Sequence, residues 1–244
     1  MTAKIQTALT TAAAIVAIAT TSAHADLHFA TPYDAHKAAT VVFVHGWLDS
    51  ERTWSPMLYT LKHTPAIAKN YNLCTWGWST TTLTWSQGAE RLKAELSKFK
   101  HSHPSVTYIL VGHSKGGALV HKISTDPTIS KTVRFSICIA AVNAGSPWAQ
   151  PFGWLPGAAD SAADTQAYRT LATATLHVPA YAIVGAFDEL VPLRSASLTG
   201  LKNVIFETAI PTGHGGAIWL ESKPGHGTTF YFTLEEPYET KVAA

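Results

Sequence analysis

The sequence predicts an α/β protein in which a mostly parallel sheet is wrapped by helices. Two observations lead to this fold class. Apolar runs of strand length alternate along the chain with segments whose apolar residues recur at helical spacing. In several of these runs the consecutive residues are apolar, as in strands that are buried on both faces of a sheet. Strands and helices in regular alternation favour parallel pairing with a helix in each crossover.

The expected strands share this apolar or β-branched character, and most end at a glycine or a polar turn. They cover residues 40–45, 71–76, 107–112, 133–142, 179–185 and 203–208. The first of these runs, TVVFVH, is a continuous β-branched run that ends at Gly46.

Three helices are expected between these strands. Ser55-Pro56 opens a short helix through about His63, because proline is favoured in the first helical turn. A longer helix buries one face, and residues 116–124 form another that ends before Asp126-Pro127. Residues 148–176 are expected to form loops and short helix over the sheet, as a small cap. The buried face of the longer helix comprises Trp85, Ala89, Leu92, Leu96 and Phe99.

The composition indicates a folded core and excludes some classes of partner. Of 244 residues, 46% are hydrophobic and 14% are charged, which favours a globular protein over a disordered one. The net charge of +2 is too small to indicate binding to nucleic acid. The 12 histidines are scattered without metal-ligand spacing, so neither a metal site nor a cofactor is expected.

The first 25 residues have the features of a secretory signal peptide. Lys4 supplies the positive start, an apolar run covers residues 8–21, and Ala23-His24-Ala25 fits the cleavage rule. The alternative is a short membrane anchor, but the run is below the roughly 20 residues that span a bilayer, so no stable membrane insertion is expected. We therefore expect cleavage near Ala25, a secreted or periplasmic protein, and one domain over residues 26–244.

Export would permit a disulfide between the two cysteines, Cys74 and Cys138. Both lie in expected strands of one sheet, with two further strands between them. Strands are ~4.8 Å apart, so the two residues would be about 14 Å apart, beyond the ~7 Å limit for a disulfide. Two free thiols are expected.

The strongest chemical signal is Gly112-His113-Ser114-Lys115-Gly116, which has the pattern G-x-S-x-G. It follows a buried strand directly and precedes a helix directly, which is the context of a nucleophile elbow. Side chains at positions 112 and 116 would collide in so tight a turn. The turn exposes the hydroxyl of Ser114 and aims the backbone N–H of Lys115 at a developing oxyanion.

A serine nucleophile needs a base and an orienting carboxylate. Asp188 follows the strand at 179–185, at the sheet edge where ligands bind. Glu189 is its rival, and Asp160 and Asp164 in the cap are more simply explained as solvated loop charges. The expected base is His214, in the glycine-rich stretch Gly213-His214-Gly215-Gly216.

His226 is the rival of His214, twelve residues further along the chain. The second oxyanion donor should come from the loop after the first strand, where the backbone N–H of Trp47 is the candidate. Gly46, beside it, lets the backbone approach a substrate.

At this point the chain resembles α/β-hydrolase lipases and esterases. The segments that carry the resemblance lie in the family's order within about residues 38–216, and they are HGW, GHSKG, NAGSPW, GAFDELVP and TGHGG. The resemblance implies the α/β-hydrolase fold and places the segment from Asn143 to Trp148 beside the elbow, where it shapes an acyl pocket. The motifs do not identify the substrate.

The end of the chain departs from this family, whose members usually continue past the catalytic histidine into a helix. Residues 214–234 resemble instead the closing hairpin of histidine-kinase ATP-binding domains. An Asn-bearing helix and a D-x-G-x-G loop are absent, so ATP binding is not expected. Alternating apolar residues around Lys223-Pro224-Gly225 predict a hairpin, within an atypical tail over residues 213–237. A lone hairpin is marginal, so it should dock on the sheet or pair with its edge strand.

The expected function is hydrolysis of a carboxylic ester, which is either a small molecule or a lipid, through Ser114, His214 and Asp188. Trp148, Phe152 and Trp154 could line an apolar acyl site, although aromatic residues in a loop are as often plain packing. Two alternatives stay open. One is a weakly active or inactive hydrolase-fold binding protein, and the other is an acyltransferase that uses the same serine.

Overall fold

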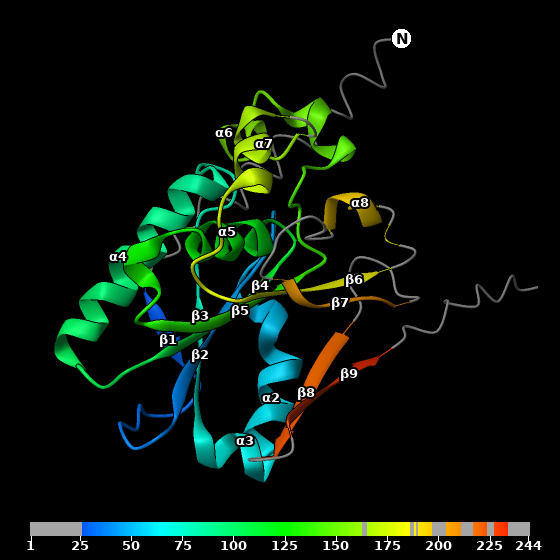
Figure 1. Ribbon diagram of the computed structural model, residues 1–244. Coiled ribbons are helices and arrows are strands. Elements are labelled where there is room, and N and C mark those ends of the chain that lie inside the picture. The colour runs from blue at the N-terminus through cyan, green and yellow to red at the C-terminus, as the bar shows by residue number, and fades with distance from the viewer. Residues whose placement is uncertain are drawn as a thin grey trace, which may run out of the picture.

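Six parallel strands form the body of a seven-stranded sheet in this computed structural model (Figure 1). The order across the sheet is β1-β3-β2-β4-β5-β6-β7, and β1 (Leu27–Phe29) runs antiparallel to β3. All six expected strands are present, which confirms the predicted fold class. They are β2 (Ala39–Val44), β3 (Tyr71–Trp76), β4 (Tyr108–His113), β5 (Val133–Ile139), β6 (Ala180–Gly185) and β7 (Val204–Ile210).

The structure describes most of the chain. The described residues are 26–162, 165–185, 188, 190–196, 204–210, 217–223 and 227–233, the last three ranges as backbone strands. The expected signal peptide, residues 1–25, lies outside the described residues, as do Asp164, Glu189, His214 and His226.

Two hydrophobic cores cover the two faces of the sheet, because successive side chains of a strand point to opposite faces. Val42 and Val44 of β2 belong to the core under α4 (Trp85–Ser102), α5 (Lys115–Ser124) and α7 (Gln166–Thr173). The intervening Val41 and Phe43 belong to the other core. That second core lies under η1 (Glu51–Trp54), α2 (Ser55–His63) and α3 (Pro65–Asn70).

The structure also corrects element boundaries. The strand expected to reach Val142 ends at Ile139, because Ala140 adopts a left-handed backbone conformation with φ 44° that cannot continue a strand. Five short elements were not expected from the sequence, and each has six residues or fewer. They are β1, η1, α3, η2 (Pro127–Ile129) and α8 (Leu193–Ala196).

The cap region consists of short helices, as expected. η3 (Pro147–Phe152) and α6 (Pro156–Ala159) precede α7, and all three lie together at one end of the molecule (Figure 1). The cap segment follows β5 in the chain and begins near the carboxyl end of that strand. The cap therefore lies near the turn that carries Ser114.

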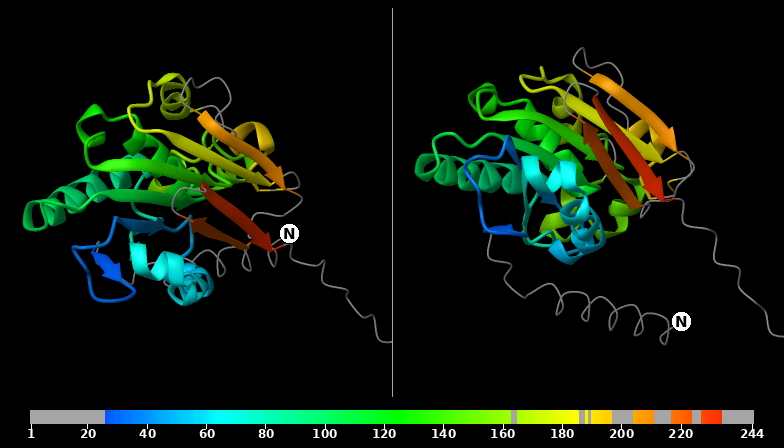
Figure 2. Two further views of the ribbon diagram at one scale, coloured as in Figure 1. Left: turned by 60° about the horizontal axis from the view of Figure 1, so that its bottom comes forward. Right: turned by 90° about the horizontal axis from the view of Figure 1, so that it is seen from below.

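The tail forms the predicted hairpin, with β8 (Ala217–Lys223) antiparallel to β9 (Gly227–Thr233). The hairpin was expected to dock on the large sheet or to pair with its edge strand. It does not pair with that strand, because β8 and β9 form a separate two-stranded sheet. β8 lies beside α2 and α3, on their side of the large sheet (Figure 2). Among the described residues, the hairpin therefore contacts these two helices and has no hydrogen-bonded neighbour in the large sheet.

The two cysteines are free and buried, as predicted. Cys74 lies on β3 and Cys138 on β5, with β2 and β4 between them. Burial raises the pKa of the Cys138 thiol to about 12, so this thiol stays protonated and behaves as a small apolar group. Within the described part of the chain, no helix combines the length and apolar character needed to cross a membrane.

Candidate active site

Ser114 occupies a strained turn between β4 and α5. Its φ of 53° and ψ of −120° lie in a region that residues with a side chain seldom adopt. Its N–H donates to the carbonyl of Ile139 at 2.9 Å, and its own carbonyl accepts from Gly117 at 2.9 Å. The same carbonyl accepts from Val142 at 3.3 Å, so the segment after β5 lies beside the elbow. Several hydrogen bonds therefore maintain the strain.

Three glycines allow this turn to pack, and two of them were expected from the motif. A Cβ on Gly112 would collide with the backbone of Gly116, and a Cβ on Gly116 would lie 2.5 Å from the carbonyl oxygen of Val44. The third is Gly46, where a Cβ would lie 2.9 Å from the Cβ of Ser114. The loop after β2 thus contacts the nucleophile turn directly.

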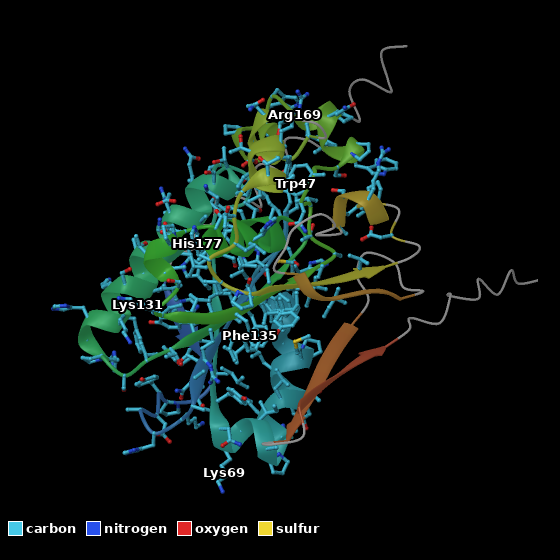
Figure 3. All side chains as sticks on the ribbon, viewed as in Figure 1. Trp47, Lys69, Lys131, Phe135, Arg169 and His177 are labelled. Carbon is cyan, nitrogen blue, oxygen red and sulfur yellow. The ribbon has the colours of Figure 1, made fainter. Side chains whose placement is uncertain are left out.

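That loop contains Trp47, the candidate oxyanion donor. Figure 3 shows Trp47 at the end of the molecule that carries α6 and α7, whereas Lys69 lies at the opposite end. The indole of Trp47 meets the ring of Phe152 edge to face, with 5.4 Å between centroids. Its buried Nε1 has no hydrogen-bond partner among the described residues.

The side chain of His45 connects the same loop to the segment after β3. Trp78 donates its backbone N–H to Nε2 of His45 at 3.4 Å, and Nδ1 of His45 lies 3.0 Å from the carbonyl oxygen of Gly46. Because Nε2 accepts and Nδ1 donates, the imidazole is neutral. Burial lowers the pKa of His45, which agrees with this neutral form.

The side chain of Lys115 is completely buried, a feature that the sequence reasoning missed. Its Nζ donates to the carbonyl oxygens of Thr80 at 3.0 Å, Leu83 at 2.7 Å and Gly157. It lies 3.8 Å from the carboxylate of Asp160 and 5.0 Å from the centre of the Trp78 ring. Burial lowers the pKa of Lys115 to about 8, while Asp160 opposes this decrease.

Asp160 is therefore not the solvated loop charge expected from the sequence. Its Oδ2 accepts from the backbone N–H of Trp85 at 2.5 Å, and its carbonyl oxygen accepts from the Trp85 indole at 2.9 Å. Burial raises the pKa of this carboxyl to about 6, and the charge of Lys115 opposes the increase. The aspartate joins the cap to the start of α4.

Asp188 follows β6, as expected, and it is 8% exposed. Its Oδ1 accepts from the backbone N–H groups of Leu190 at 2.9 Å and Val191 at 2.8 Å, which fixes the carboxylate at this turn. The segment after β5 supports the turn, because the hydroxyl of Ser146 donates to the carbonyl of Leu190 at 2.5 Å. The elbow and the Asp188 turn therefore share one neighbouring segment.

The remaining predicted site residues differ in their placement. Phe152 packs on Trp47, whereas Trp148 is 59% exposed and Trp154 is 66% exposed. His214 falls between β7 and β8 in the sequence, outside the described residues. Of the residues that the structure describes, no group of three or more His, Cys, Asp or Glu side chains could hold a metal ion.

Comparison with known proteins finds neither a matching family model nor a matching curated protein. Many solved structures do match. Lipase B of Aspergillus fumigatus has a TM-score of 0.59 at 16% identity, over 75% of this chain and 47% of that one. A monoacylglycerol lipase of Paleococcus ferrophilus has a TM-score of 0.57 at 13% identity, over 78% and 90%.

A lipase-esterase related protein of Clostridium acetobutylicum has a TM-score of 0.54 at 12% identity, over 78% of this chain and 92% of that one. At such low sequence identity, the structural similarity shows that these proteins share the arrangement of helices and strands. The resemblance of residues 214–234 to histidine-kinase domains stays a prediction from the sequence. The sheet order, the flanking helices and these neighbours show that the chain has the α/β-hydrolase fold.

Proposed function

We propose that this protein is a serine hydrolase that cleaves carboxylic esters through an acyl-enzyme. The single observation that carries the proposal is the conformation of Ser114, whose φ of 53° is maintained between a buried strand and a helix. Such strain is expensive, about 1–3 kcal/mol, and it is retained where function requires it. A structural turn at this point could use glycine and avoid the cost.

In the proposed reaction, Oγ of Ser114 attacks the ester carbonyl while His214 accepts the hydroxyl proton. The tetrahedral intermediate collapses, His214 returns the proton to the leaving alkoxide, and water then hydrolyses the acyl-enzyme by the same steps. The backbone N–H groups of Lys115 and Trp47 would stabilise the oxyanion. The position of Lys115 at the start of α5 supports this role, because the first N–H groups of a helix have no intrahelical partner.

The proposed role of Asp188 is to orient His214 and to stabilise its imidazolium. Two backbone N–H groups donate to Oδ1 of this aspartate, and these hydrogen bonds hold the carboxylate in place. Its place after β6 supports the role, since ligand sites of open α/β sheets lie at the carboxyl ends of the strands.

The choice between lipid and short-chain esters depends on the aromatic residues near the cap. Trp47 and Phe152 pack together, and the exposed Trp148 and Trp154 lie in the same stretch of chain as Phe152. Exposed aromatic side chains of this size suit an apolar acyl chain. The names of the structural neighbours, which include lipases, agree with an acyl substrate.

Hydrolysis of p-nitrophenyl esters of graded acyl length by the purified protein tests the proposal. We expect release of p-nitrophenol from at least one ester and none from the Ser114→Ala variant at the same folded concentration. Added alcohol separates the acyltransferase alternative, because a transferase would form the new ester in preference to the free acid. A folded protein inactive on every ester would favour the binding-protein alternative. Export with cleavage near Ala25 is a further part of the proposal, and sequencing of the mature N-terminus tests it.

A further inference from the structure

The buried ammonium of Lys115 joins three parts of the chain to the nucleophile helix. An ammonium has three N–H donors, and here they meet three backbone carbonyls, those of Thr80, Leu83 and Gly157. The first two belong to the segment between β3 and α4, and the third belongs to α6 in the cap. Asp160 supplies the counter-charge at 3.8 Å. The side chain is 1% exposed, so water cannot replace these contacts.

Thr80 extends this connection to the loop after β2. Its hydroxyl oxygen accepts the backbone N–H of Leu48 at 3.0 Å, while its carbonyl accepts from Lys115. Leu48 has a φ of 56°, a left-handed conformation that a leucine adopts only when the surroundings impose it. The residue directly before Leu48 is Trp47, whose amide is the second candidate oxyanion donor.

We propose that the side chain of Lys115 is a positioning residue that holds the Trp47–Leu48 backbone in place through Thr80. This inference rests on the proposed esterase function, because Trp47 matters as an oxyanion donor. One residue would then serve the oxyanion hole twice. Its amide is one donor, and its ammonium, through Thr80, holds the loop that supplies the other.

A neutral side chain at position 115 would leave the carbonyls of Thr80, Leu83 and Gly157 without their donor. The segment that contains Thr80 would then relax, and the hydrogen bond to Leu48 would lengthen. Donors of an oxyanion hole act only at short range from the developing charge. A displaced Trp47 amide therefore stabilises the transition state less than the same amide in its wild-type position. Because oxyanion donors act mainly on the transition state, kcat should fall and KM should change little.

Steady-state kinetics on four variants test this path. Lys115→Met removes the charge at similar length, and Thr80→Val removes the hydroxyl but keeps the carbonyl. We expect Lys115→Met to lower kcat about 100-fold and Thr80→Val about 10-fold, with KM within about threefold of the wild type. The double variant should be no slower than Lys115→Met alone, because both act through one hydrogen-bond chain. Thr80→Ser keeps the hydroxyl and should restore the wild-type rate.

Lys122→Met is the matched control, because Lys122 lies on the same helix and takes no part in these contacts. It should leave kcat within about twofold of the wild type. A Lys115→Met kcat within twofold of the wild type would overturn the proposal. So would a double variant whose loss is the product of the two single losses. If Lys115→Met does not fold, the comparison of Thr80→Val with Thr80→Ser replaces it. Equal kcat values for these two variants would refute the proposed connection through Thr80.

Hydrogen exchange of the peptide that contains residues 44–54 distinguishes failure of this inference from failure of the proposed function. Lys115→Met and Thr80→Val should both increase exchange there, and Lys122→Met should not. This readout needs no catalysis, so it applies even if the wild type hydrolyses no ester. Unchanged exchange in both variants would overturn the inference while leaving the esterase proposal intact.

Discussion

Gly46 lies face to face with Ser114, so closely that a Cβ on Gly46 would be 2.9 Å from the Cβ of the serine and 3.4 Å from its Oγ. The contact joins the loop after β2 to the turn after β4. β2 and β4 are neighbouring strands of the sheet. A methyl group at position 46 would have to displace either the serine or the loop that carries Trp47.

Gly46→Ala should therefore lower kcat/KM about 100-fold, because a displacement near 1 Å at a catalytic group costs about that much. Ester hydrolysis and circular dichroism measure the rate and the fold. Gly153→Ala is the control, since a Cβ there would come no closer than 3.4 Å to the carbonyl of Gln150. Equal activities of the two variants would show that Gly46 imposes no constraint on Ser114.

The strain at Ser114 should appear as a stability difference between two inactive variants. Ser114→Gly relieves the left-handed φ and should raise the free energy of unfolding by about 1 kcal/mol relative to Ser114→Ala, which keeps a Cβ. Denaturant unfolding of both variants measures the difference. A glycine variant no more stable than the alanine variant would mean that the turn stores no strain.

His121 should make the protein less stable in acid. It is buried on α5, where Nδ1 meets Oδ1 of Asn143 at 3.1 Å, and burial lowers its pKa to about 4. The unfolded chain takes up a proton near pH 6.5, so this stabilisation is present above 6.5 and is lost as pH falls toward 4. The loss is about 3 kcal/mol at most.

Denaturant unfolding between pH 7.5 and 4.5 checks this prediction against His121→Gln, which retains a donor for Asn143. The difference in unfolding free energy between wild type and variant should shrink as the pH falls. Using the difference removes the opposite contribution of Asp160, whose raised pKa makes the protein lose stability as pH rises toward 6. A constant difference over this range would refute the assignment.

The hairpin should stabilise the fold through α2 and α3, which β8 contacts. Deleting residues 223–244 removes β9 and leaves β8 without its strand partner. We expect the Tm to fall by several degrees, as a loss near 1 kcal/mol produces in a domain of this size. Deleting only residues 234–244, beyond β9, is the control. Equal Tm values for the two truncations would show that the hairpin contributes nothing.

Much of the fold could be predicted because its strands are buried on both faces. Residues 40–44 and 107–111 are unbroken apolar or β-branched runs, and G-x-S-x-G follows the second directly. Short elements were not predicted, because few residues give little periodic signal. β1, for example, has three residues and depends on pairing with β3. The end of β5 was not predicted either, since the left-handed Ala140 depends on packing around Ser114 and not on local preference.

The site could be predicted only where neighbours in the sequence define it. Ser114 and its glycines belong to one pentapeptide, whereas the partners of the Lys115 ammonium lie 32 to 42 residues away. Burial of the Lys115 side chain was not predicted, because the motif defines the turn at this residue and not the direction of its side chain. Nothing in the spacing indicated which carbonyls would receive it. Asp160 was misread for the same reason, because its partners Trp85 and Lys115 are distant in sequence.

Labelling with an organophosphonate, followed by mass spectrometry of the digested protein, tests the central claim most directly. The reagent bonds to a serine only if that serine is activated as a nucleophile and its oxyanion is stabilised. We predict one adduct, on the peptide that contains Ser114, and none in the Ser114→Ala variant. A folded wild-type protein that stays unlabelled, or an adduct on another residue, would contradict the proposed active site.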